Sequence, residues 1–310
     1  MAIYDYAKYN EEILGNKSYI ICFTENAQRQ MGFPTVRHSY NKFDSRFHII
    51  TINNIDEMSS VINKFNLQFF YTQTGGGNDI YKFNDKSIWG NCKTIKHCVF
   101  DTKCPESDYY ISISECLNVT NQTNIPVIPY IVDPLPNTDD NFRNELKIPI
   151  DAVVFGRYGG ESEFNIPFAH EAIKEYLNID NKCYFVFMNT NPFYKHDRII
   201  YLDKNVDLLY KSKFINTCDD MIHARAMGET FGLAIAEFSM KNKPIITCPC
   251  GDLEHIKILG DKAIKYSSKE ELLGIFQDIK NIANSKTDWN AYREYSAENI
   301  MKKFDAVIFS

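Results

Sequence analysis

Residues 221–251 read MIHARAMGETFGLAIAEFSMKNKPIITCPCG, and this stretch is the most informative in the chain. The first of its two glutamates, Glu229, precedes a small, flexible run, and the second, Glu237, follows eight residues later within a helical pattern. Pro244 breaks that pattern, and a short apolar run typical of a buried strand follows it. The stretch therefore predicts a loop that holds Glu229, a helix that holds Glu237, and a strand.

This arrangement suits a phosphorylated ligand. The start of a helix offers unpaired backbone N–H groups and a positive dipole end, and Gly232 lets an anion approach the backbone closely. Eight helical residues span roughly 12 Å, about the reach from a sugar past a diphosphate to a ribose. Apolar neighbours surround Glu237, so its carboxylate needs hydrogen bonds to offset burial. Ribose hydroxyls would supply them, and so would a protein N–H or an arginine; both alternatives stay open at this point.

The same stretch resembles the donor-site segment of retaining GT-B glycosyltransferases of the family 4 type, which includes relatives of sucrose and glycogen synthase. The residues that match in register are Glu229, Phe231, Gly232, Leu233, Glu237, Pro244 and Ile245. The resemblance covers residues 150–270 well and the N-terminal half weakly. It implies an α/β protein with two Rossmann-like parallel-sheet domains that face a cleft, the N-terminal one short. It also implies metal-independent transfer of a sugar from a nucleotide diphosphate sugar, most simply a UDP- or GDP-sugar, to a carbohydrate or other acceptor hydroxyl.

The second half of the chain carries the predicted donor site. An apolar strand runs into Gly156 and Arg157, as at the start of the family's nucleotide domain, and the guanidinium fork suits a diphosphate. The lysine that the family usually places five or six residues later is missing from residues 162–165, and Arg225 or His223 could replace it. The residues predicted to bind the donor are Gly156, Arg157, Asn189, Leu202, Arg225, Glu229, Thr230, Phe231, Gly232, Leu233 and Glu237.

Two N-terminal features could carry chemistry. A glycine-rich turn follows a predicted strand, where α/β sheets place ligands, and we assign it to the acceptor side; the alternative is a mobile loop. His97 lies at a strand end, and the resemblance predicts that it faces the reacting sugar across the cleft from Glu229; the alternative is a core histidine. A metal site at Cys92, His97, Cys98 and Cys104 has irregular spacing that matches no zinc pattern. The residues of the predicted acceptor-side turn are Gly75, Gly76, Gly77, Asn78 and Asp79.

Length and composition set the remaining expectations. A chain of 310 residues predicts two domains, which we place at residues 1–133 and 134–288, with a helix within residues 289–310 packing back onto the first. A net charge of −6 argues against a nucleic-acid partner. Without a signal-peptide pattern or a run of about 18 apolar residues, the chain is expected to be cytoplasmic, with no membrane span and with its nine cysteines reduced.

Hydrophobic patterns predict alternating strands and helices, hence parallel sheets. The absence of any D-x-D motif leaves a metal-bound diphosphate unsupported, so no cofactor is expected. Two other functions remain open, an inactive sugar- or nucleotide-binding module and a nucleotide-sugar epimerase of the same fold. The predicted strands are 18–23, 46–51, 67–71, 94–100, 109–113, 152–156, 183–188, 198–202, 244–247 and 263–266. The predicted helices are 3–14, 55–65, 168–177, 206–211, 253–259, 270–282 and 289–304, together with a helix around Glu237 that ends at 240.

Overall fold

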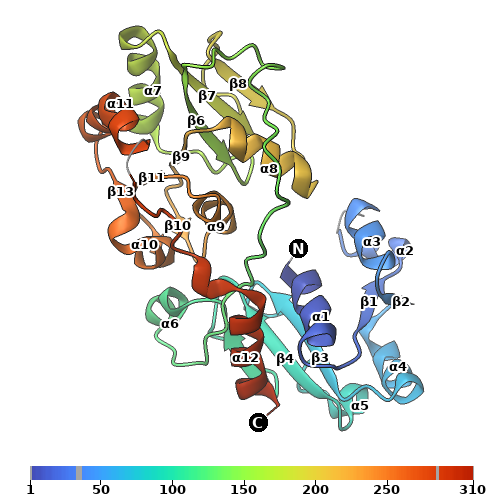
Figure 1. The fold of residues 1–310 in the computed structure, drawn as a ribbon. Helices are drawn as coiled ribbons and strands as arrows, with labels where there is room; N and C mark the ends of the chain where they lie inside the picture. The colour runs from blue at the N-terminus through green and yellow to red at the C-terminus, as the bar shows by residue number, and fades with distance from the viewer. Residues whose placement is uncertain (1, 33–36, 284–285, 310) are drawn as a thin grey trace. The chain divides into compact units, whose positions relative to one another are not determined.

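The structure is a computed structural model that describes residues 2–32, 37–283 and 286–309. The chain forms two compact units (Figure 1). Unit 1 contains Met1–Ile131 and Tyr295–Ser310, and unit 2 contains Val132–Glu294. The first boundary between the units follows Ile131, two residues before the position expected at 133. The second follows Glu294, six residues after the position expected at 288. Unit 2 is thus inserted into unit 1, which the C-terminal helix completes.

Unit 1 contains parallel strands in two separate sheets, one of β1 and β2 and one of β3, β4 and β5. The strands lie within a few residues of the predicted ones, whereas α2, α3, α5 and α6 were not predicted. Its elements are α1 (Ala2–Glu12), β1 (Tyr19–Phe23), α2 (Glu25–Gln30), α3 (Arg37–Asp44), β2 (His48–Ile52), a 3₁₀ turn (Ile55–Glu57), α4 (Met58–Phe65), β3 (Phe69–Thr74), α5 (Lys86–Trp89), β4 (Lys93–Cys98), β5 (Tyr109–Ser112), α6 (Glu115–Asn121) and α12 (Ala297–Ile308).

Separate hydrophobic clusters stabilise the two halves of unit 1. Trp89 and Met58, both fully buried, anchor one cluster, against which Phe23 of β1 and Phe70 of β3 pack. The other joins α1 and α12 to the three-stranded sheet through Tyr6, whose hydroxyl donates to the carbonyl of Pro129 at 2.6 Å. A cavity of about 690 Å³ is lined by residues of both β1 and β3. Side-chain packing therefore holds together two sheets that no strand pairing links among the described residues.

Unit 2 is built on one parallel sheet with the strand order β13-β11-β9-β6-β7-β8. Its elements are β6 (Val153–Tyr158), α7 (Pro167–Ile179), β7 (Cys183–Met188), β8 (Ile199–Leu202), α8 (Leu208–Thr217), β9 (Asp220–His223), β10 (Gly228–Glu229), α9 (Leu233–Met240), β11 (Ile245–Thr247), β12 (Asp252–Leu253), α10 (Glu254–Leu259), a 3₁₀ turn (Gly260–Lys262), β13 (Ala263–Lys265), α11 (Lys269–Ala283) and a second 3₁₀ turn (Arg293–Tyr295), which ends in unit 1.

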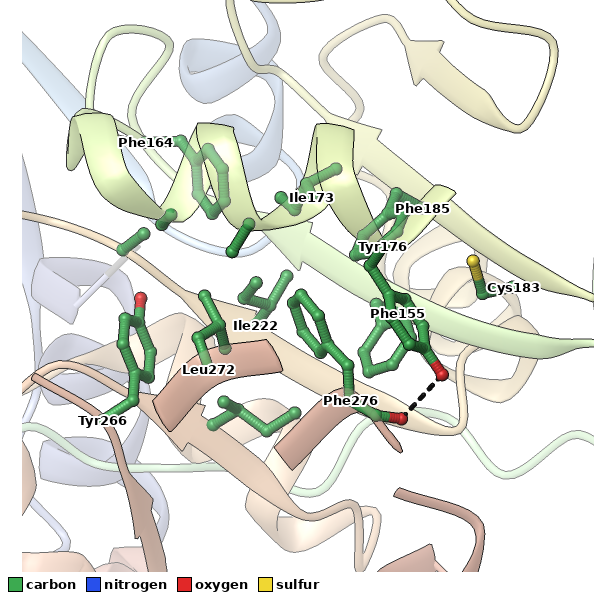
Figure 2. Packing of buried hydrophobic residues seen from close by; sticks show 14 of the residues in the cluster. Phe155, Phe164, Ile173, Tyr176, Cys183, Phe185, Ile222, Tyr266, Leu272 and Phe276 are labelled. Carbon is green, nitrogen blue, oxygen red and sulfur yellow. Dashed lines mark hydrogen bonds between the residues drawn. The ribbon is translucent and has the colours of Figure 1, made fainter. Parts of the chain in front are cut away.

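Aromatic residues fill the core between this sheet and helices α7 and α11 (Figure 2). Phe155 and Phe185 stack with ring centroids 4.9 Å apart, and Phe276 of α11 packs against both. The hydroxyl of Tyr176 donates to the carbonyl of Phe276 at 2.8 Å, which ties α7 to α11. The central strands are buried on both faces, as is usual for a parallel sheet between helices. In such sheets ligands usually bind at the carboxyl ends of the strands.

The C-terminal helix starts later than predicted. The sequence predicted a helix over 289–304, but α12 begins at Ala297, where Ser296 caps the N-terminus by accepting from the N–H of Asn299. The preceding segment instead packs on unit 2, where the hydroxyl of Tyr292 donates to the carbonyl of Phe231 at 2.9 Å. This tertiary contact outweighs the helical periodicity of the segment.

Candidate active site

Glu229 lies in a short strand, not in the loop that the sequence predicted. Strand β10 pairs in parallel with β12, so that Gly228 and Glu229 lie opposite Asp252 and Leu253. Gly228 has a φ of +65°, and a Cβ at this position would lie 2.1 Å from the carbonyl oxygen of Asp252. Only glycine permits so close an approach in this conformation. The backbone that presents Glu229 is therefore fixed by the pairing of two segments more than twenty residues apart.

The Glu229 carboxylate is held by two nitrogen donors. Its Oε1 lies 3.2 Å from Nε2 of His223, and its Oε2 accepts from Nη1 of Arg225 at 2.9 Å. Burial alone would raise the pKa of Glu229, but the hydrogen bond from His223 and the charge of Arg225 outweigh it and lower the pKa below its ordinary value. The carboxylate is therefore ionised at neutral pH and fixed in orientation.

Arg225 connects Glu229 to the loop that follows β6. Its Nε forms an ion pair with Glu163, within the segment where the family's lysine is missing, while its Nη1 binds Glu229. The side chain of Arg225 remains 19% exposed. Arg225 is thus a partly exposed guanidinium at this site, and replacement of the missing lysine by Arg225 or His223 remains a prediction.

Arg157 is deeply buried. Its side chain is 4% exposed; Nη1 donates to Oγ1 of Thr190 at 2.5 Å and to the carbonyl of Asn189, and Nη2 donates to the carbonyl of Gly160. Burial lowers the pKa of Arg157 to about 10, so the group remains charged. In this conformation the guanidinium fork binds the loops after β6 and β7 together, and its contact with a diphosphate remains a prediction.

Two further predicted donor contacts shape the same edge of the sheet. Asn189 has a φ of +51°, its side-chain amide donates to the carbonyl of Gly159 at 2.6 Å, and its N–H donates to the carbonyl of Leu202 at 3.0 Å. Leu202 ends β8 and is half-buried. Asn189 and Leu202 are therefore neighbours beside the loop that Arg157 holds, and their contact with a nucleotide remains a prediction.

Glu237 binds a lysine that sequence reasoning missed. Nζ of Lys211, on α8, donates to both carboxylate oxygens of Glu237 at 2.7 Å and lies 5.1 Å from the ring centre of Tyr158. The two side chains are 17% and 16% exposed. Nothing in the local pattern signals this pair, because 26 residues separate its members. The sequence predicted that Glu237 would bind either the hydroxyls of a ribose or a protein group, namely an N–H or an arginine. In the structure its partner is a lysine.

Helix α9 begins between the two glutamates. Gly232 caps it in the left-handed conformation with a φ of +85°, and the first N–H groups of the helix have no intrahelical acceptor. Thr230 and Phe231, just before the helix, are 8% and 1% exposed, whereas Leu233 is half-buried. Phe231 therefore anchors the turn in the core, Gly232 is itself buried, and Leu233 keeps part of its surface exposed.

Gly156 has a packing role. A Cβ here would lie 2.2 Å from Sγ of Cys218 and 3.2 Å from Phe238, on the sheet face that α9 covers. Gly156 is fully buried and its Cα faces protein, and its contact with the donor remains a prediction.

We expect Gly156→Ala to lower the free energy of unfolding of unit 2 by about 1–3 kcal/mol, since overpacking a filled core forces neighbours to shift. Gly274→Ala in α11 is the matched control, because a Cβ there meets nothing within 4 Å and alanine favours a helix by about 0.5–1 kcal/mol. Urea denaturation monitored through Trp289 measures both changes. A Gly156→Ala protein as stable as the wild type would contradict this account.

His97 is a core residue of unit 1. Its side chain is 0% exposed, Nε2 donates to the carbonyl of Ile128 at 2.8 Å, and Nδ1 lies 2.8 Å from the hydroxyl of Tyr71. Because a carbonyl only accepts, Nε2 carries the proton and Nδ1 accepts from Tyr71. Both ring nitrogens are satisfied by protein, so the prediction that His97 is catalytic is wrong, and the core histidine weighed beside it is the correct interpretation.

This burial predicts acid sensitivity of unit 1. Burial lowers the pKa of His97 to about 4 from an ordinary value near 6.5, so the unfolded chain takes up this proton at a higher pH than the folded one. Stability should fall as the pH drops through this window, by about 3 kcal/mol at pH 4. Urea unfolding at pH 7 and pH 5 measures the loss, and His97→Gln should reduce the pH dependence. An unchanged dependence in His97→Gln would contradict the assignment.

A buried lysine of unit 1 holds the predicted acceptor-side turn in place. Gly76 has a φ of +98°, and a Cβ there would lie 1.6 Å from the carbonyl oxygen of Asp101. Lys96 of β4 is fully buried; its Nζ donates to the carbonyl of Gly77 at 2.7 Å and forms an ion pair with Asp79 at 3.1 Å. Gly75 and Asn78 are exposed. The turn is thus a fixed structural element, and its role toward an acceptor remains a prediction.

The described residues offer neither a cluster for a metal ion nor a helix that could span a membrane. Over 2–32, 37–283 and 286–309, no cluster of three or more histidine, cysteine, aspartate or glutamate side chains is arranged to hold a metal ion. Within the same ranges, none of the helices has both the length and the apolar character needed to cross a bilayer. The nine cysteines are free thiols.

Comparisons with known proteins identify the fold. No protein-family model matches the chain, and no curated protein matches it in sequence. A glycosyltransferase from Rickettsia africae ESF-5 superposes with a TM-score of 0.67 at 16% identity over 98% of this chain and 89% of that one. Anabaena Alr3699/HepE in complex with UDP gives 0.70 at 13% identity over 99% and 96%. A structure described as a UDP-N-acetylglucosamine 2-epimerase from Listeria monocytogenes gives 0.59 at 12% over 99% and 92%. The chain therefore has the GT-B fold, as the sequence predicted.

Proposed function

We propose that this protein is a retaining glycosyltransferase that moves a sugar from a nucleotide diphosphate sugar to an acceptor hydroxyl without a metal ion. The observation that carries the proposal is the pair of carboxylates on either side of the start of α9, Glu229 and Glu237, each held by a cation of the protein. Similarity of fold to a glycosyltransferase from Rickettsia africae supports it.

Each part of this site suits one part of the donor. Glu237 is partly exposed and accepts hydrogen bonds, so it would bind the ribose hydroxyls. The N–H groups at the start of α9 and the guanidinium of Arg225 would bind the diphosphate, offsetting the charge that develops as it leaves. Glu229 would bind the hydroxyls of the transferred sugar. UDP is the favoured nucleotide, because HepE, which has a similar fold, has been solved with UDP and with UDP-glucose.

We infer retention of configuration because the segment around Glu229 resembles the donor site of retaining glycosyltransferases. The bond between the anomeric carbon and the diphosphate breaks, and the acceptor oxygen bonds to the same face of that carbon. The departing phosphate oxygen takes the proton of the acceptor hydroxyl, so no side chain is needed as a general base. This agrees with the burial of His97 in a core.

A donor screen tests the proposal. A ligand at 100 times its dissociation constant stabilises its protein by about 2.7 kcal/mol, so UDP-, GDP- and ADP-sugars can be ranked by thermal shift. The best donor is then incubated with a panel of sugar acceptors, with and without EDTA, and products are examined by NMR. An EDTA-resistant product with the anomeric configuration of the donor is expected. A free epimer would indicate an epimerase, and binding without turnover would indicate an inactive binding module.

We expect Glu237→Gln to weaken binding of UDP about tenfold or more, even without a sugar, because it removes a charge-assisted hydrogen bond worth about 1.5–3 kcal/mol. Titration calorimetry with UDP and with uridine should show similar losses, since the ribose is common to both. Glu270→Gln, on the exposed side of α11, is the matched control. Unchanged UDP affinity in Glu237→Gln would contradict the assignment to the ribose.

A further inference from the structure

Three buried polar side chains form a chain of hydrogen bonds behind Glu229. His223 of β9 is 5% exposed, and Thr247 of β11 and His255 of α10 are 0% exposed. Oγ1 of Thr247 lies 2.9 Å from Nδ1 of His223 and 3.1 Å from Nε2 of His255. Nε2 of His223 in turn lies 3.2 Å from Oε1 of Glu229. The two imidazole rings are 5.1 Å apart between centroids. Buried polar groups in such a chain constrain one another strongly.

The hydroxyl of Thr247 couples the two histidines. It carries a single proton, so it donates to one of the facing ring nitrogens and accepts from the other. The hydrogen bonds between the two histidines and Thr247 can therefore run in only two directions. In one, His255 donates from Nε2 to Thr247, and Thr247 donates to His223. In the other, both donations are reversed.

The carboxylate of Glu229 favours the first direction. A carboxylate only accepts, so Nε2 of His223, which lies 3.2 Å from Oε1 of Glu229, carries a proton. Nδ1 of a neutral His223 then accepts from Thr247, and Thr247 accepts from Nε2 of His255. Burial lowers the pKa of His255 to about 3, so its ring is neutral. Thr247 then donates to Nδ1 of His223, whose own proton lies on Nε2, facing Glu229.

We propose that His223 is a positioning residue for Glu229, and that Thr247 and His255 hold it as the neutral tautomer with its proton on Nε2. The consequence for sugar transfer rests on the proposed function, whereas the arrangement of protons does not. In the reverse direction His223 would need a proton on both nitrogens to bind Glu229. That would add a third cation beside Arg225 and Arg157, which face two carboxylates, Glu229 and Glu163.

NMR of histidine side-chain nitrogens tests the arrangement without any substrate. In wild-type protein, His223 and His255 should each show a protonated Nε2 and an unprotonated Nδ1, with the signals assigned from His223→Gln and His255→Gln. Thr247→Val removes the acceptor of His255, so the His255 proton should move to Nδ1, toward the backbone of Glu229 and Asp252. Thr247→Ser keeps the hydroxyl and should keep the wild-type pattern. A doubly protonated His223 at neutral pH, or a proton on Nδ1 of His255 in the wild type, would overturn the proposal.

Kinetics with the best donor test the role. Thr247→Val should lower kcat about five- to tenfold with the UDP dissociation constant within twofold, and Thr247→Ser should rescue most of the loss. His223→Gln, which can place an N–H near the position of Nε2, should retain more turnover than His223→Leu. This second comparison still holds if Thr247→Val fails to fold. The positioning role would be overturned if kcat fell equally in Thr247→Val and Thr247→Ser and equally in His223→Gln and His223→Leu. It would also be overturned if the variants lost only affinity for UDP, because the hydrogen bonds would then be merely structural. A wild-type protein with the expected NMR pattern but no transfer would refute the proposed function alone.

Discussion

Replacing Glu229 by glutamine is expected to lower the rate of sugar transfer by about 10²–10³-fold, the usual cost of removing one preorganised electrostatic group. Glutamine keeps the shape of the side chain and an oxygen that can accept from His223. It removes the negative charge that faces Arg225 and the strongest acceptor for the sugar hydroxyls. Affinity for bare UDP should stay within about twofold, because Glu237, the start of α9 and Arg225 remain in place.

Steady-state kinetics and calorimetry on the same preparations separate these effects. Glu270→Gln again serves as the exposed control, and thermal unfolding checks that Glu229→Gln is folded. If Glu229→Gln and Glu237→Gln lose UDP equally, then the assignment of one carboxylate to the sugar and the other to the ribose is wrong. If turnover is unaffected, Glu229 has no part in transfer.

Lys96→Met should destabilise unit 1 by about 3–5 kcal/mol, because removing one member of a buried ion pair leaves the other charge uncompensated. Lys96 is fully buried and holds both Asp79 and the carbonyl of Gly77. Lys93, on the same strand, is 54% exposed in its ion pair with Asp108, so Lys93→Met should change stability by less than about 1 kcal/mol.

The two tryptophans make this measurement specific. Trp89 is buried in unit 1, and Trp289 belongs to unit 2, so a Trp289→Phe background leaves Trp89 to report on unit 1 during guanidinium denaturation. Adding Asp79→Asn to Lys96→Met should recover part of the loss, since it removes the unpaired charge. Equal stability of the Lys93 and Lys96 variants would contradict the role of the buried pair.

The GT-B fold was predictable because its signals are local. Apolar strands such as Val153–Tyr158 and Cys183–Met188 stand out by composition, and the motif around Gly232 fixes a turn and a helix start within a few residues. The prediction of helix 289–304 failed in its first turns, because the contact of Tyr292 with Phe231 competes with local periodicity.

The candidate site was less predictable because its contacts are long-range. Lys211 and Glu237 are 26 residues apart, and His97 finds its carbonyl partner 31 residues away at Ile128. A histidine at a strand end has the same local pattern whether it faces a ligand or a core, so His97 was assigned wrongly. Arg157 was rightly placed beside a turn, but sequence gave no sign that the loops would engage its donors.

The position of α12 has a consequence for the order in which the protein is made. Ile300, Met301 and Phe304 complete the cluster around Tyr6 of α1, yet ribosomes synthesise them after all of unit 2. Domains generally fold as they emerge, so unit 2 can reach its native state while the first 131 residues still lack part of their core. During that interval the apolar surface of α1 and β3 has no cover from α12. Dependence on a chaperone during translation would therefore be greatest for the segment that is synthesised first.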